Sequence, residues 1–187
     1  MPRASKKGGK KKKSSNSKAS KMTIEERTAA AKESLDKGNV AFKSANYDSA
    51  ALYYSEALKM DPSNEDLYAA RCAAYLKQAV MPMNENKEGH LKSAAADAKK
   101  CVSLKPDWGK GWCRLGQVRL VGTDGNRAAD AFRKGLEVDP LNQVLEEGLA
   151  EAKRMIAKGM DKKIGTGYVL LEFELSWANH KFCARLA

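Results

Sequence analysis

Two cations lie four residues apart in the stretch from Pro106 to Gly116, and their spacing is the strongest chemical signal in the chain. Residues at positions i and i+4 share one face of an α-helix, so Lys110 and Arg114 would project together if this stretch is helical. An ammonium and a guanidinium at fixed positions bind carboxylates through charge-assisted hydrogen bonds. The pair therefore predicts a site for an acidic group, provided that the fold places this helix along a groove.

The elements that would hold this pair follow a fixed period. Pro106 and Pro140 are 34 positions apart and end two successive units. Within the unit that begins at Gly109, large and small apolar residues occupy the places where two packed helices meet. These residues are Trp112, Leu115, Gly116, Ala128 and Phe132. A period of this length with this pattern is the signature of the tetratricopeptide repeat, a helix–turn–helix unit.

Two further units, before the one that begins at Gly109, show the same spacing of large and small apolar residues. The sequence therefore predicts an all-α fold of three tetratricopeptide helix–turn–helix repeats, stacked as a right-handed superhelix with a C-terminal capping helix. The predicted domain covers residues 23–162, and its first helix pair is expected at 24–44 and 47–60. Its parts are a first repeat at about 31–64, a second at 65–108, a third at 109–142 and the capping helix at about 143–160.

The second repeat is longer than the other two. From Tyr75 to Ala94 there are 19 steps where the repeat expects about nine, so ten extra residues lie between its two helices. The segment 78–90 contains them, and the helix breakers Pro82 and Gly89 predict that they form a loop insertion. A repeat stack tolerates an insertion in a loop, so the array is expected to continue past it.

The two ends of the chain differ from the domain. Residues 1–22 are a Lys-rich segment of low complexity, predicted to be a disordered tail. The net charge is +11, and residues 1–21 hold nine positive charges without an acid, so only +2 remains for the rest. The run Lys10–Lys13 has three interpretations: a solvated tail, a signal for an import receptor, or a loose contact with RNA or an anionic surface. Residues 163–187 form a C-terminal tail of unknown structure.

The sequence carries no signature of an enzyme, a metal site or a membrane span. It lacks a nucleophile–base pairing and a glycine-rich phosphate loop, so we predict no catalytic residue, metal, cofactor or small-molecule substrate. No apolar run approaches the ~20 residues of a membrane helix. The four cysteines match neither a disulfide framework nor a paired metal spacing. We therefore expect a cytoplasmic protein that also enters the nucleus.

Three segments carry a resemblance to a known family. They are Gly38-Asn39 with Tyr47, then Leu67-Tyr68 with Arg71 and Ala73-Ala74-Tyr75, then Leu104 to Trp112. Over about residues 25–160 the chain resembles the co-chaperone domains with three tetratricopeptide repeats, above all the amino-terminal domain of the heat-shock organising protein family. This resemblance implies a concave groove that binds the acidic C-terminal peptides of the seventy- and ninety-kilodalton heat-shock chaperones.

In that family five residues clamp the two carboxylates of a terminal aspartate. The resemblance places Asn39, Lys110 and Arg114 at matching positions, whereas Leu35 replaces a lysine and Ala70 replaces an asparagine. Each charged hydrogen bond contributes roughly 1.5–3 kcal/mol, so a partial clamp binds more weakly unless other cations compensate. The candidates for compensation are Lys32, Lys37, Arg71 and Lys77, although Arg71 is also expected to pack between helices with its guanidinium toward an acid.

Two interpretations of the function remain open from the sequence. In the first, the chain is a non-enzymatic adaptor, a co-chaperone that binds acidic C-terminal peptides of heat-shock chaperones through Asn39, Lys110 and Arg114. In the second, it is a scaffold for an unrelated peptide or helix, and the basic tail supplies a nuclear or RNA contact. Lys110 and Arg114 would then be ordinary solvated helix residues. The sequence does not identify the chaperone or the oligomeric state.

Overall fold

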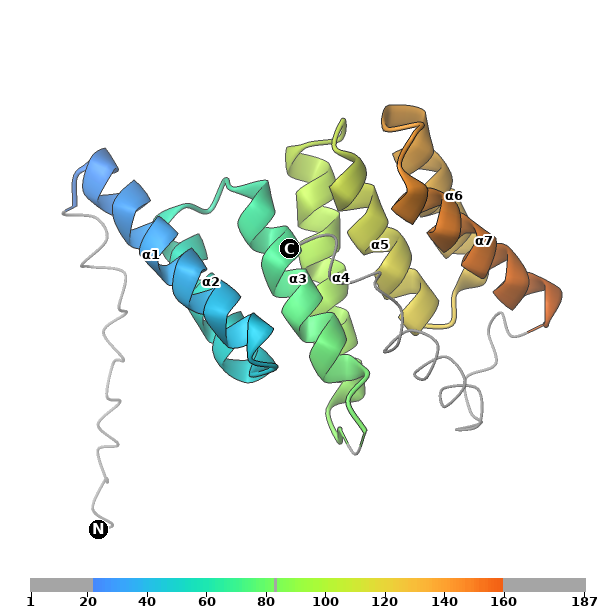
Figure 1. Ribbon diagram of the computed structural model, residues 1–187, viewed down its shortest axis with the longest axis horizontal. Helices are drawn as coiled ribbons and strands as arrows, with labels where there is room; N and C mark the ends of the chain where they lie inside the picture. Colours follow the sequence, from blue (N-terminus) through green and yellow to red (C-terminus); the bar gives the residue numbers. More distant parts are fainter. Residues whose placement is uncertain (1–21, 83, 160–187) are drawn as a thin grey trace, which may run out of the picture.

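The computed structural model describes residues 22–82 and 84–159, and the regular elements of this part are seven α-helices (Figure 1). They are α1 (Ile24–Lys43), α2 (Tyr47–Met60), α3 (Glu65–Ala79), α4 (Lys87–Leu104), α5 (Gly109–Val121), α6 (Gly125–Val138) and α7 (Gln143–Ala157). The prediction of an all-α fold is confirmed. None of these helices is long and apolar enough to cross a membrane. The predictions for the basic tail and for residues 163–187 lie outside the described residues.

The helices pack as consecutive antiparallel pairs, α1 with α2, α3 with α4 and α5 with α6, and α7 packs on α6 (Figure 1). Local signals set where they begin. Thr23 and Glu26 form a reciprocal capping box at the start of α1, with hydrogen bonds of 2.8 and 3.2 Å. The turns after α1 and α5 each contain a residue with a left-handed backbone, Ala45 (φ 58°) and Thr123 (φ 56°). These short turns hold the two helices of a pair side by side.

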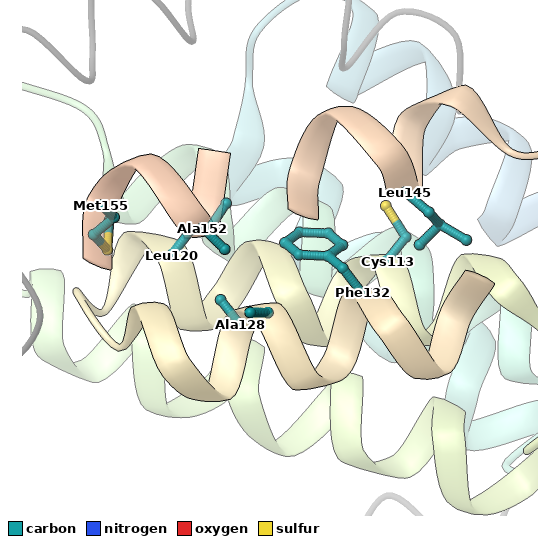
Figure 2. Close-up of a cluster of buried hydrophobic side chains, with 8 residues drawn as sticks. Cys113, Leu120, Ala128, Phe132, Leu145, Ala152 and Met155 are labelled. Carbon is teal, nitrogen blue, oxygen red and sulfur yellow. The ribbon is translucent and has the colours of Figure 1, made fainter. Parts of the chain in front are cut away.

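Aromatic rings fill the space between paired helices, and glycines make room for them. Phe132 of α6 is fully buried within a cluster that also includes Leu145 and Met155 of α7 (Figure 2). A Cβ on Gly116 of α5 would lie 2.5 Å from Cζ of this ring. In the first pair, a Cβ on Gly38 would meet the ring of Tyr54 at the same distance. The ring-against-glycine contact thus occurs in the first and third helix pairs, whereas the second pair has Cys72 and Ala98 at the corresponding positions.

The insertion in the second repeat differs from the prediction of a loop over 78–90. Compared with the third repeat, α3 is two residues longer than α5, α4 is four longer than α6, and the connection 80–86 is four longer than 122–124. Six of the ten extra residues are therefore helical, and Gly89, taken as a breaker, lies inside α4. A glycine within a helix costs about 1 kcal/mol, and the packing of Leu91 against the core around Leu76 offsets that cost.

The ring-against-glycine contact gives a test of the packing. We expect Gly116→Ala to lower the free energy of unfolding by about 1–2 kcal/mol, because overpacking against Phe132 outweighs the gain of up to about 1 kcal/mol in helix propensity. Urea denaturation measures the change. Gly111→Ala in the same helix is the matched control, since its Cβ would lie 3.5 Å from the nearest atoms and should not destabilise. An equal effect of both substitutions would contradict this account of the core.

Candidate functional site

A groove of about 340 Å³ opens between α1, α3 and α5, and the side chain of Tyr54 reaches its wall from α2. Its lining includes all five positions that the family resemblance singles out: Leu35, Asn39, Ala70, Lys110 and Arg114. The first helix of each repeat thus contributes to one surface, because equivalent positions of stacked repeats face the same way. That these residues bind a peptide stays a prediction.

Arg114 is the most unusual charge in the groove. The residue is only 5% exposed, and its Nη1 donates to Oε1 of Gln117 at 3.0 Å. Its Nε has no acceptor, and no salt bridge to Arg114 exists among the described residues. The alternative prediction of an ordinary solvated helix residue is therefore wrong for Arg114. A buried charge without a counter-ion is costly to the free protein and is relieved by an anion that enters the groove.

Lys110 lines the groove one helical turn before Arg114 on α5 and already has an acidic neighbour. Its Nζ is 3.3 Å from Oδ1 of Asp66 in the first turn of α3, and it sits 5.4 Å from the centroid of the Trp108 ring. The Lys110 side chain is 31% exposed and that of Asp66 57%. An exposed pair of this kind contributes about 0–1 kcal/mol, so a ligand carboxylate has to displace Asp66 but loses little by doing so.

Asn39 is oriented by a buried hydroxyl. The Tyr54 hydroxyl donates to Oδ1 of Asn39 at 3.0 Å, which leaves the Nδ2 donor of the amide for a ligand. Burial raises the pKa of Tyr54 to about 12, although the nearby positive charge of Arg114 lowers it in part. The hydroxyl therefore stays protonated, as a donor must. Sequence reasoning missed this role of Tyr54, because its position in the repeat period indicates only packing between the paired helices.

Leu35 and Ala70, the two substituted positions of the clamp expected from the resemblance, form part of the apolar wall of the groove. Leu35 packs against the clusters that contain Tyr54 and Leu58, and Ala70 packs against the first of these. Both also line the groove. At the positions where the family resemblance expects a lysine and an asparagine, this chain thus has two apolar side chains. They pack against the core, line the groove and offer no hydrogen-bond donor to a carboxylate.

Two further lysines supply positive charge to the groove. Lys77, one of the predicted compensating residues, lines it from α3, and Lys43 lines it from α1. Sequence reasoning missed Lys43, although its position four residues after Asn39 places both on one helix face. Lys37 instead pairs with Glu33 at 2.7 Å on the exposed surface. Lys32 is exposed and is not among the lining residues.

Arg71 holds the fold together and does not line the groove. Its guanidinium donates to both carboxylate oxygens of Asp97 at 2.8 and 2.7 Å and to Oγ of Ser55 at 2.9 Å. Asp97 is only 4% exposed, and the Arg71 guanidinium lies over the ring of Tyr75. The structural role expected for Arg71 is confirmed. Its proposed compensation in the clamp is wrong, because its charge is already paired with Asp97 and its side chain does not line the groove.

Comparisons with known proteins agree with this architecture. No family model matches the chain. The Hsp70-Hsp90 organizing protein of Triticum aestivum is 41% identical over 127 residues, which is 68% of this chain and 20% of that protein. The chain thus spans about a fifth of the length of this protein and of the other organizing proteins that it matches.

Solved structures share the fold, among them two tetratricopeptide-repeat (TPR) domains with bound peptides. The first TPR of Spaghetti (RPAP3), bound to the HSP90 peptide SRMEEVD, is 25% identical with a TM-score of 0.60, covering 70% of this chain and 95% of that one. The second TPR domain of human RPAP3, in complex with the HSP70 peptide SGPTIEEVD, is 25% identical with a TM-score of 0.59, covering 70% and 98%. The predicted tetratricopeptide-repeat fold class is confirmed.

The contact between Tyr54 and Asn39 gives a test by pH. We expect Tyr54→Phe to lower the free energy of unfolding by about 1 kcal/mol at pH 7. The pKa of Tyr54 in the folded state, about 12, exceeds its ordinary value of 10.0. Below pH 10 the wild type therefore keeps its full stability, and between about pH 10 and 12 it loses stability as the unfolded chain ionises.

The phenylalanine variant has no hydroxyl at this position and should lose less stability over that interval. Urea unfolding at pH 7, 9 and 11 measures the difference. Tyr53→Phe, at the neighbouring and less buried position of α2, is the control. The same pH dependence in both variants would show that the Tyr54 hydroxyl is not the buried donor described here.

Proposed function

Since this chain belongs to the tetratricopeptide-repeat domains of the co-chaperone type, we propose that it is a non-enzymatic adaptor that binds acidic C-terminal peptides of seventy- and ninety-kilodalton heat-shock chaperones. The observation that carries the proposal is the buried guanidinium of Arg114, which lines the groove without a salt bridge among the described residues. Such a charge is expected to bind an anion from outside the chain.

The charge of the groove supports an acidic ligand. Four cationic side chains line it, and Asp66 is the one acidic side chain among its lining residues. The cations are Lys43, Lys77, Lys110 and Arg114. Because the groove walls exclude part of the surrounding water, charges along them attract an oppositely charged chain more strongly than isolated surface charges do.

The arrangement of polar and apolar groups supports a peptide with the same alternation. Asn39, Lys110 and Arg114 offer donors to a carboxylate, while Leu35, Ala70 and neighbouring Ala73 form an apolar surface beside them. The peptides bound by the two RPAP3 domains both end in Glu-Glu-Val-Asp, with one apolar residue between acids. In this chain the terminal acid would lie on the donors, and the apolar residue on the adjacent wall.

The loss of two family donors sets the expected affinity. Leu35 and Ala70 cannot hydrogen-bond a carboxylate, so the terminal aspartate would be held by fewer contacts. Lys43 and Lys77 lie one helical turn beyond Asn39 and Ala73, where they could contact the acidic residues upstream of the terminal aspartate. We therefore propose binding at micromolar strength or weaker, with more of the affinity coming from upstream acids than in a complete clamp.

Titration calorimetry with a peptide that ends in Glu-Glu-Val-Asp tests the proposal. We expect Lys110→Ala to weaken binding about 10- to 100-fold, because one charge-assisted hydrogen bond is lost. Lys105→Ala is the matched control. Lys105 lies over the same Trp108 ring and pairs with Glu65, but it does not line the groove. Absence of heat with the wild type would refute the proposal.

Two further arms of the titration separate the contributions. Asp66→Asn removes the acid that competes for Lys110 and should strengthen binding by up to about five-fold. A peptide that ends in an amide should bind more weakly than the free acid. Equal binding of both peptides would instead favour the scaffold for an unrelated peptide, the second interpretation from the sequence.

We also propose a cytoplasmic location with access to the nucleus. Cys72 and Cys101 are buried free thiols, which is common in a reducing compartment. Burial raises the pKa of both thiols, that of Cys101 to about 12, so neither is reactive. The Lys-rich residues 1–21, outside the described part, would supply the contact with RNA or an import receptor. Imaging a fluorescent fusion with and without residues 1–21 tests this, and an unchanged nuclear fraction would contradict it.

A further inference from the structure

Gln117 is a fully buried polar residue that contacts the groove's buried cation. It lies on α5, three positions after Arg114, and its exposed fraction is 0%. Its Oε1 accepts a hydrogen bond of 3.0 Å from Nη1 of Arg114. Its own Nε2 and the Nε of Arg114 have no partner among the described residues. The two side chains thus form a buried group with spare donors, one member of which lines the groove.

A second arginine, Arg71, shows how the charge of a structural cation is compensated in this fold. The guanidinium of Arg71 is held by the buried carboxylate of Asp97 through two hydrogen bonds, so its charge is compensated within the chain. At Arg114 the corresponding partner is the neutral amide of Gln117. An amide oxygen can fix the direction of a guanidinium, but it cannot neutralise the charge.

We propose that Gln117 is the positioning residue that orients Arg114 toward the groove while leaving its positive charge available to a carboxylate of the bound peptide. This inference rests on the proposed function. It names the residue on which the affinity of Arg114 for the peptide carboxylate depends. The free protein bears an uncompensated charge because the partner at position 117 is neutral. An acidic group of the ligand then supplies the counter-ion that Arg114 lacks among the described residues.

The substitution Gln117→Glu tests this directly. A carboxylate of nearly the same shape would accept the same hydrogen bond from Arg114 and neutralise it from inside. We expect the melting temperature to rise, because a buried unpaired charge gains a counter-ion, and the affinity for the Glu-Glu-Val-Asp peptide to fall about ten-fold or more. Differential scanning calorimetry and titration calorimetry on the full chain measure the two effects. Opposite signs for stability and affinity are the distinguishing result.

Two other variants separate positioning from packing. Gln117→Met keeps the volume but removes the acceptor, so Arg114 loses its orientation. We expect a several-fold loss of peptide affinity without a rise in melting temperature. Gln143→Glu makes the same charge change at an exposed site at the start of α7, away from the groove residues. A helix N-terminus favours an acid, so this control should keep its stability and bind the peptide as the wild type does.

The outcomes distinguish the inference from the function on which it rests. If Gln117→Glu and Gln117→Met both bind the peptide like the wild type while Lys110→Ala does not, the role of Gln117 is refuted and the proposed function stands. If the wild type binds no peptide, both are refuted. If Gln117 had only a structural role, the peptide affinity of both variants would fall only where the melting temperature falls as well. That result would also overturn the inference. Should Gln117→Glu fail to fold, the affinity of Gln117→Met decides.

Discussion

The close approach of paired helices over an aromatic ring is the contact on which the rest of the structure depends. Gly38 faces Tyr54 in the first pair, and Gly116 faces Phe132 in the third, with no room for a Cβ at either glycine. The first contact also builds the groove. It draws α2 so near to α1 that the Tyr54 hydroxyl reaches Asn39, so a single residue serves both the core and the orientation of a groove amide.

One buried cation of the groove, Arg114, has no carboxylate partner among the described residues and is therefore available to an acid from outside the chain. Arg71 and Arg114 each donate a hydrogen bond to a buried side chain, yet the partner of Arg71 is the carboxylate of Asp97 and that of Arg114 is the amide of Gln117. Burial lowers the cost of displacing water from a guanidinium when a ligand arrives, because that water has already been removed during folding. The folded chain is thus less stable than it would be with a counter-ion, and a ligand acid can recover the difference.

The repeat period predicts much of this arrangement and fails at identifiable places. The positions of the helices and the shared face of Lys110 and Arg114 follow from the spacing of prolines, glycines and aromatic residues. The burial of Arg114 does not follow, since it depends on side chains from other helices. Neither does the pairing of Lys110 with Asp66, 44 positions away in the sequence. The helical insertion was missed because Gly89 was weighed as a breaker without the packing of Leu91, which is a tertiary contact.

The two departures from the family clamp have a common physical consequence. Leu35 lines the groove and at the same time packs against two buried clusters, so it couples the wall of the groove to the core. A lysine at this place would have to keep its ammonium in water and could fill the gap only with its stem. The substitution thus exchanges a flexible cation for fixed apolar surface, and with Ala70 also apolar, the charge of the groove is concentrated on α5 and at the ends of α1 and α3. A ligand that matches this groove needs acidic groups opposite α5 and opposite the ends of α1 and α3, with an apolar side chain between them. Negative charge alone would therefore not be enough for a ligand to match the groove.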